Sequence, residues 1–118
     1  MGKIILKNIR TFSYHGCLIE ESKIGSNYQI NLEIENDLSK SEISDNLSDT
    51  VDYVLLNQIV VDEMAIRANL LENVARRIID ISLSKIQSIT YIKVAVSKLN
   101  PPIGGDVQEV TIEIEKYR

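Results

Sequence analysis

The feature that most constrains the fold of this chain is an alternation of apolar and polar residues near both of its ends. Within Ser26–Glu35 every second residue from Tyr28 to Ile34 is apolar, and the same alternation returns after Ser88 and again close to the C-terminus. A period of two puts the apolar side chains on one face of a β-strand, so each segment predicts a half-buried strand of an antiparallel sheet. The three apolar sets are Tyr28, Ile30, Leu32 and Ile34; Ile92, Val94 and Val96; and Val110, Ile112 and Ile114.

The middle of the chain changes to a helical period. One helix is expected to begin near Thr50, a favourable N-cap, and to carry apolar residues at helical spacing, among them Val54, Leu55 and Ile59. Residues 37–50 before it are rich in Ser and Asp and poor in apolar side chains. So long a connection is unusual, and part of it is expected to have a function or to form a short helical turn. Residues 14–25 are expected to form a polar connecting loop.

A second helix is expected to begin near Asn69, with an apolar stripe made by Leu71, Val74, Ala75 and Ile78. A first strand at residues 3–12 and a turn rich in proline and glycine at 100–106 complete the organisation. The order is therefore ββααββ, which predicts one α+β domain over residues 1–118, with both helices on one face of a four-stranded sheet. Because the sheet edges need partners, copies of the chain are expected to associate through them.

Composition argues against several classes of function. The net charge is −4, and Lys and Arg are dispersed, so a nucleic-acid partner is not expected. No apolar run approaches the roughly 18–20 residues that span a bilayer, and the first residues do not resemble a signal peptide, so a cytoplasmic protein is expected. A zinc site usually takes several His or Cys ligands, whereas this chain has only His15 and Cys17, so no metal is expected. His15 is interpreted as a turn or packing residue and Cys17 as a small buried hydrophobe.

Glu72 is the first candidate for a functional role. It follows Asn69 at the spacing of a capping box, which would give it a purely structural purpose. A carboxylate at a helix N-terminus also stays ionised, and it could accept two parallel hydrogen bonds from an amino-amidine edge such as that of a pterin or guanine.

Three more side chains are candidates for a functional role, and each also has a structural interpretation. Lys98 ends a strand in the same parity as three apolar residues, so its amine should reach the rim of the buried face. Burial there would lower its pKa and permit proton transfer. Tyr53, in the first turn of the first helix, could be a packing residue with a solvated hydroxyl. Glu21 could be a solvated loop charge.

Five segments, in order, give these candidates a common context. They are YHG at 14–16, the acidic stretch that ends in Ile24-Gly25, SDNLSDTVDY at 44–53, NLLENVARRI at 69–78 and VSKLNPPI at 96–103. With them the chain resembles the dihydroneopterin aldolases over nearly its whole length. One departure is Ser26, where the family usually has Gln.

The resemblance implies the tunnelling fold, in which ββααββ subunits form rings of four that usually stack as octamers, with active sites between neighbours. It also implies a pterin substrate of folate biosynthesis and no cofactor. Glu72 would anchor the pterin ring beside the backbone N–H of Leu71, and Glu21 would hold the hydroxylated side chain.

The resemblance also assigns the proton-transfer groups. Lys98 would be the acid/base lysine, and Tyr53 would come from the adjacent subunit to act in proton transfer, with the backbone at Val51 lining the same wall. Two alternatives remain: an epimerase that inverts C2′ of dihydroneopterin or of its triphosphate, and a pterin-binding ring protein without catalysis. The zinc-dependent pterin synthases of the same fold are disfavoured by the single His and the single Cys.

Overall fold

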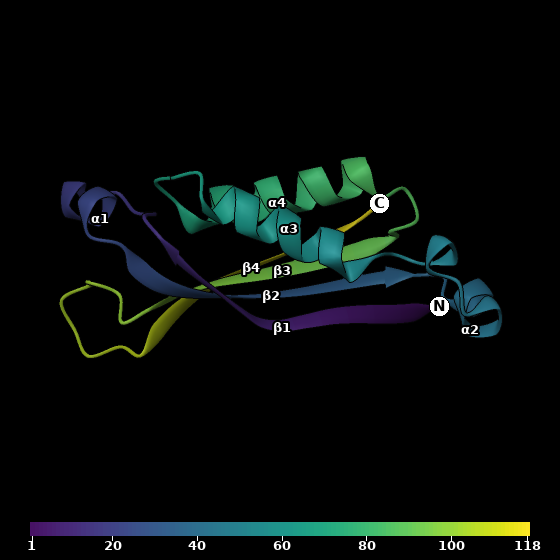
Figure 1. Ribbon diagram of the computed structural model, residues 1–118. Helices are drawn as coiled ribbons and strands as arrows, with labels where there is room; N and C mark the ends of the chain where they lie inside the picture. The colour runs from purple at the N-terminus through teal and green to yellow at the C-terminus, as the bar shows by residue number, and fades with distance from the viewer.

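The computed structural model describes residues 1–118, and its framework is one antiparallel sheet with the strand order β1-β2-β3-β4. The strands are β1 (Gly2–Ser13), β2 (Ser26–Asn36), β3 (Tyr91–Leu99) and β4 (Glu109–Tyr117). Each strand pairs with the strand that precedes or follows it in the chain, so β1 and β4 are the two edges of the sheet (Figure 1). The four segments predicted from alternation and β-branched residues are thus confirmed as strands.

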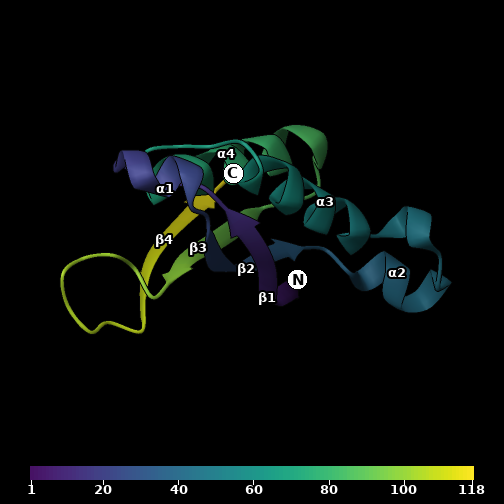
Figure 2. The ribbon, with the colours of Figure 1, turned by 60° about the vertical axis from the view of Figure 1, so that its left-hand side comes forward.

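Two long helices, α3 (Tyr53–Met64) and α4 (Leu71–Lys85), lie on the same face of this sheet (Figure 2). A cluster of 20 buried apolar residues fills the space between the two layers. The alternating residues of β2 and β3 supply one side of it, and α4 supplies Val74, Ala75 and Ile78 on the other. The predicted α+β arrangement, with both helices on one face, is confirmed.

The first long helix begins later than the sequence predicts. Asp52 is its N-cap, and the Asp52 carboxylate accepts a hydrogen bond of 2.9 Å from the N–H of Val54. The prediction of Thr50 as the cap was wrong because Thr50 instead closes a preceding turn, donating its N–H to Leu47. The buried face also differs: Leu56, Ile59, Val60 and Met64 are buried, whereas Val54 and Leu55 are exposed.

The second long helix has no side-chain cap. Its N-cap position is Leu70, not Asn69, and the predicted capping box with Glu72 does not form. The reason is that the Asn69 side chain is engaged elsewhere, since its amide oxygen accepts a hydrogen bond of 3.2 Å from Arg67. Glu72 therefore lies in the first turn of α4 with a carboxylate that the helix does not use.

Three short helices occupy the connections. The polar segment 37–50 contains α2 (Ser39–Ser44) and the 3-10 helix η1 (Leu47–Asp49), which confirms the expected helical turn. The segment 14–25 is not only loop, because it contains α1 (Ile19–Lys23), which the sequence did not predict. None of the helices has both the length and the apolar character that crossing a bilayer requires.

The molecule is elongated, with extents of 52 × 24 × 22 Å, and its two ends differ (Figure 1). At one end α1 lies near the β3–β4 connection and the start of α4, and at the other end α2 lies near the start of α3. The sequence-predicted site residues are divided between these two ends.

Candidate active site

A hollow of about 470 Å³ lies at the end of the molecule that carries α1. It is formed where the α1 segment, the first turn of α4, the end of β3 and the following proline-rich turn meet. Four of the predicted site residues line it: Glu21, Leu71, Glu72 and Lys98. The structure thus brings together residues from three distant parts of the chain.

Lys98 is positioned by the pairing of β2 with β3. It lies opposite Tyr28 in the register, and its ammonium nitrogen is 5.6 Å from the centre of the Tyr28 ring. Its side chain is only 7% exposed. The amine donates a 2.7 Å hydrogen bond to the carbonyl of His15 and forms an ion pair with Glu21. Lys98 thus lies at the rim of the buried face, where it lines the hollow, and its two acceptors hold the amine there rather than in solvent.

The ionisation of Lys98 also differs from the sequence prediction. Burial lowers the pKa of an amine, but the hydrogen-bonded Glu21 carboxylate and the nearby Tyr28 hydroxyl favour the charged form. The second effect is the larger, so the pKa of Lys98 is raised above its ordinary value rather than lowered. This direction favours the ammonium form of Lys98.

Glu21 reaches Lys98 because the preceding loop leaves room for it. Gly16 has φ +139°, and a β-carbon at this position would collide with the Glu21 carboxylate. The carboxylate also accepts a 3.2 Å hydrogen bond from the N–H of Leu18. Burial raises the pKa of Glu21, but the hydrogen bonds from Lys98 and Leu18 outweigh it, so the net pKa is lowered. Glu21 is therefore an ionised partner and not a solvated loop charge.

Glu72 faces the same hollow from the first turn of α4. It is exposed and has no hydrogen-bond or ion-pair partner within the chain. The N–H groups of a helix's first turn lack intrahelical acceptors, so the N–H of Leu71 is available beside this carboxylate. A free carboxylate next to free N–H groups can recognise a planar group that presents both donors and an acceptor.

Tyr53 and Val51 do not reach this hollow. They line a second, largely apolar hollow of about 430 Å³ that also includes residues of β1, Leu38 and Leu47. Tyr53 is 59% exposed, whereas Val51 is buried. No residue lines both hollows, so the fold of a single chain does not unite Tyr53 with Lys98.

His15 and Tyr28 belong to the Lys98 site although the sequence did not identify them as functional. Tyr28 falls in an alternating apolar set and therefore looks like a core residue, and a lone His beside a glycine carries little information. His15 is buried, which confirms its interpretation as a packing residue. Cys17, expected to be buried, is exposed, and its thiol donates to the carbonyl of Asn69 at 3.5 Å.

A buried ammonium–carboxylate pair and a free carboxylate that line one hollow are polar groups of the kind that small-molecule sites contain. The sequence model of dihydroneopterin aldolase (FolB) matches residues 4–115. A dihydroneopterin aldolase of Streptococcus pyogenes serotype M18 is 38% identical over 122 aligned positions, with all of both chains covered. The chain belongs to the dihydroneopterin aldolase family.

Solved structures show that the fold is shared as well. The E. coli dihydroneopterin aldolase in complex with neopterin superposes with a TM-score of 0.90 at 20% identity, covering 98% of this chain and 99% of that one. The Burkholderia thailendensis dihydroneopterin aldolase bound to guanine superposes with a TM-score of 0.78 at 21% identity, covering 99% and 91%.

Proposed function

We propose that the protein is a cytoplasmic dihydroneopterin aldolase of folate biosynthesis. In this reaction the C1′–C2′ bond of 7,8-dihydroneopterin breaks. The C2′ hydroxyl loses its proton and becomes the aldehyde of glycolaldehyde, while the bond electrons pass into the C=N bond of the ring. Return of a proton to C1′ then gives 6-hydroxymethyl-7,8-dihydropterin. Because the ring itself accepts the electrons, the protein needs to supply binding, orientation and proton transfer.

The observation that carries this proposal is the placement of Glu72 and of the Lys98–Glu21 pair on one hollow. Glu72 can accept two hydrogen bonds from the amino-amidine edge of a pterin, and the N–H of Leu71 can donate to the adjacent ring oxygen. Neopterin and guanine, the ligands of the two related enzymes, both present such an edge. The pterin side chain would then extend toward Glu21 and Lys98.

The state of Lys98 suggests how the first proton is removed. Glu21 keeps Lys98 charged in the free subunit. Substrate hydroxyl groups that hydrogen-bond to Glu21 would weaken this pair, and the pKa of Lys98 would fall as its acceptor is lost. Lys98 could then take the C2′ proton, directly or through water, and Tyr53 could help to return a proton to C1′. In this mechanism the amine remains a proton carrier and forms no bond to carbon.

We infer that the complete site needs two subunits. Tyr53 and Val51 line a hollow at the opposite end of the molecule from Lys98, and β1 and β4 each have one free edge. If β1 of one copy pairs with β4 of the next, the sheet continues around a ring and its edges are satisfied. A ring of four, or two stacked rings forming an octamer, would place Tyr53 of one subunit near Lys98 of its neighbour.

A C2′ epimerase is the second candidate because cleavage followed by re-addition of glycolaldehyde would use the same groups. The charges of the hollow favour an unphosphorylated substrate for either reaction. Its lining contains two carboxylates, Glu21 and Glu72, but only one cationic side chain, Lys98. A triphosphate would require more positive charge.

The decisive experiment is incubation of the purified protein with 7,8-dihydroneopterin, followed by separate measurement of glycolaldehyde, 6-hydroxymethyl-7,8-dihydropterin and the C2′ epimer. Equal amounts of the first two products are expected, and treatment with EDTA should leave the rate unchanged. Epimer without glycolaldehyde would support the second candidate. Tight pterin binding with neither product would identify a non-catalytic binding protein.

The same assay tests Lys98. General acid–base groups typically contribute about 10²–10⁴-fold to rate. Lys98→Ala should lower single-turnover cleavage by that order, with a much smaller loss of affinity for a pterin product, which Glu72 holds. Lys98→Arg should not restore turnover because a guanidinium keeps its proton near neutral pH. Near-normal turnover by Lys98→Ala at saturation would remove the lysine from the mechanism.

A further inference from the structure

His15 is a buried residue that contacts several groups of the Lys98 site. Its side chain is almost fully enclosed, with 1% of the residue exposed. Its backbone carbonyl accepts two hydrogen bonds, one of 2.7 Å from the Lys98 ammonium and one of 3.0 Å from the Tyr28 hydroxyl. The position of this single carbonyl therefore fixes where the amine of Lys98 lies.

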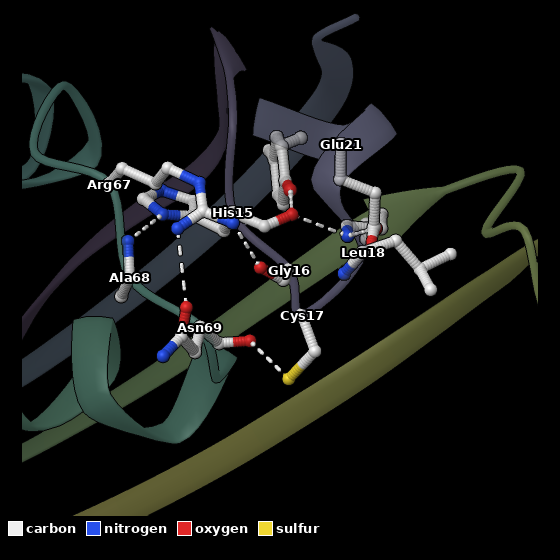
Figure 3. Close-up of polar contacts among 10 residues, drawn as sticks. His15, Gly16, Cys17, Leu18, Glu21, Arg67, Ala68 and Asn69 are labelled. Atoms are coloured by element: carbon white, nitrogen blue, oxygen red, sulfur yellow. Dashed lines mark hydrogen bonds and ion pairs between the residues drawn. The ribbon is translucent and has the colours of Figure 1, made fainter. Parts of the chain in front are cut away.

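The imidazole of His15 in turn fixes that carbonyl. Its Nδ1 atom accepts a 3.1 Å hydrogen bond from the N–H of Ala68, in the segment that leads into α4 (Figure 3). The adjacent Gly16 N–H donates to the Ala68 carbonyl at 3.0 Å, so the two segments are joined in both directions. Arg67 adds a third link, a 2.6 Å hydrogen bond to the Gly16 carbonyl.

This arrangement requires a neutral imidazole with a free lone pair on Nδ1. The surroundings maintain that state. Burial, helped by the positive charges of Arg77, Lys98 and Arg67 and opposed by the Met64 backbone, lowers the pKa of His15 to about 4. A neutral His15 cannot exchange protons readily near neutral pH. Its contribution is thus geometric, because it links the Lys98 carbonyl acceptor to the chain that precedes Glu72.

We propose that His15 is a positioning residue: its imidazole, bound to the Ala68 amide, holds the His15 carbonyl where it fixes the Lys98 amine against Glu21. The proposal rests on the proposed function only in taking Lys98 as the proton carrier. A misplaced group in an active site can lower the rate by as much as about 10²-fold without changing the chemistry available. His15 would therefore affect the chemical step through Lys98, with no contact to the substrate.

Three substitutions of His15 distinguish the effect of losing the hydrogen bond from the effect of changing the side-chain volume. His15→Asn keeps an acceptor close to the position of Nδ1, His15→Gln moves the acceptor further along the side chain, and His15→Leu removes it. The first measurement is acylation of Lys98 by acetic anhydride, followed by mass spectrometry of the peptide that contains it. Only an uncharged amine reacts, so a Lys98 that leaves its acceptors should react faster. We expect His15→Leu and His15→Gln to be labelled about tenfold faster, and His15→Asn to resemble the unchanged protein.

The second measurement is single-turnover cleavage paired with equilibrium binding of a pterin product. We expect about tenfold slower cleavage in His15→Leu and His15→Gln, affinities within about threefold, and rescue in His15→Asn. Leu83→Ala is the control, since it removes buried volume from α4 away from the hollow. It should lower the melting temperature without accelerating Lys98 labelling.

Two results would overturn the proposal. One is unchanged Lys98 labelling in folded His15→Gln or His15→Leu, and the other is an equal increase in Leu83→Ala. The labelling does not depend on catalysis. If the protein failed to cleave dihydroneopterin, the proposed function would fail while the labelling still decided whether His15 holds Lys98.

Discussion

The Glu21 carboxylate accepts a hydrogen bond from the Lys98 ammonium although 77 positions separate the two residues in the chain. Burial alone would lower the pKa of this amine, and the paired carboxylate reverses the direction of the shift. In the proposed mechanism, the charge of Lys98 would therefore depend on what occupies the hollow that this pair lines together with Glu72. A ligand that engages Glu21 would then also lower the proton affinity of Lys98.

Glu21→Gln should lower the pKa of Lys98, because a neutral amide no longer favours the charged amine while the burial remains. The pH dependence of Lys98 acylation should then shift to lower pH, so that labelling at any one pH near neutrality is faster. Glu20→Gln is the matched control, since Glu20 is an exposed neighbour in the same helix. Identical labelling profiles for the two variants would show that Glu21 does not control the charge of Lys98.

Tyr53→Phe and Lys98→Ala should each be nearly inactive alone and regain activity when mixed. If every site takes Lys98 from one subunit and Tyr53 from its neighbour, random assembly of an equal mixture gives about a quarter of the sites both intact residues. The measurement is glycolaldehyde release after the two variants are unfolded, mixed and refolded together, with each refolded alone as control. Light scattering should give a tetramer or octamer. An active monomer, or no recovery in mixed rings, would contradict a shared site.

Glu72→Ala should weaken pterin binding with little effect on stability. A charge-assisted hydrogen-bonded pair is worth roughly 1.5–3 kcal/mol, which corresponds to about a ten- to hundredfold loss of affinity. Because Glu72 forms no capping box, its contribution to the helix is limited to the dipole interaction, about 0.3–1 kcal/mol. Binding of a pterin product should be measured by calorimetry beside thermal melts, with Glu42→Ala in α2 as control. Unchanged affinity with a large fall in melting temperature would mean that Glu72 is structural.

The sequence predicts those features of the molecule that depend on periodicity. Alternation placed three of the strand segments, and β-branched residues placed the first. Alternation also put Lys98 in the same parity as Ile92, Val94 and Val96, and that parity directs its side chain to the buried face. The sequence pattern could not show whether the pKa of Lys98 is raised or lowered. That direction depends on Glu21, which lies in α1 and contacts Lys98 only in the folded chain. The predicted first residues of the two long helices were wrong for a similar reason. Asn69 was a plausible cap, but its side chain is bound to Arg67.

The local sequence around His15 also does not predict its role. Its imidazole contacts Ala68 and its carbonyl contacts Lys98, both distant in sequence. A single histidine with no metal-binding spacing gives no indication of either contact. Residues whose function depends on several long-range hydrogen bonds become visible only when the fold is known.

His15 should also make stability depend on pH in a way that one substitution can isolate. Its pKa is lowered from 6.5 to about 4, by burial first and then by Arg77, Lys98 and Arg67, while the Met64 carbonyl opposes the shift. The unfolded chain therefore binds a proton on this histidine more readily than the folded chain does. The stability that a neutral His15 provides is fully present above pH 6.5, and it is lost as the pH falls from 6.5 toward 4.

His15→Asn keeps a hydrogen-bond acceptor but does not titrate, so the difference in unfolding free energy between the two proteins isolates this effect. At about 1.4 kcal/mol per pKa unit, the original protein should lose roughly 2–3 kcal/mol more than His15→Asn between pH 7 and pH 4. The Glu21–Lys98 pair and the neutral Tyr28 hydroxyl also face His15, but both proteins retain them and their contributions cancel. Denaturant unfolding at fixed ionic strength and several pH values gives the comparison. Parallel stability curves for the two proteins would mean that His15 titrates normally in the folded state and is not held neutral by its surroundings.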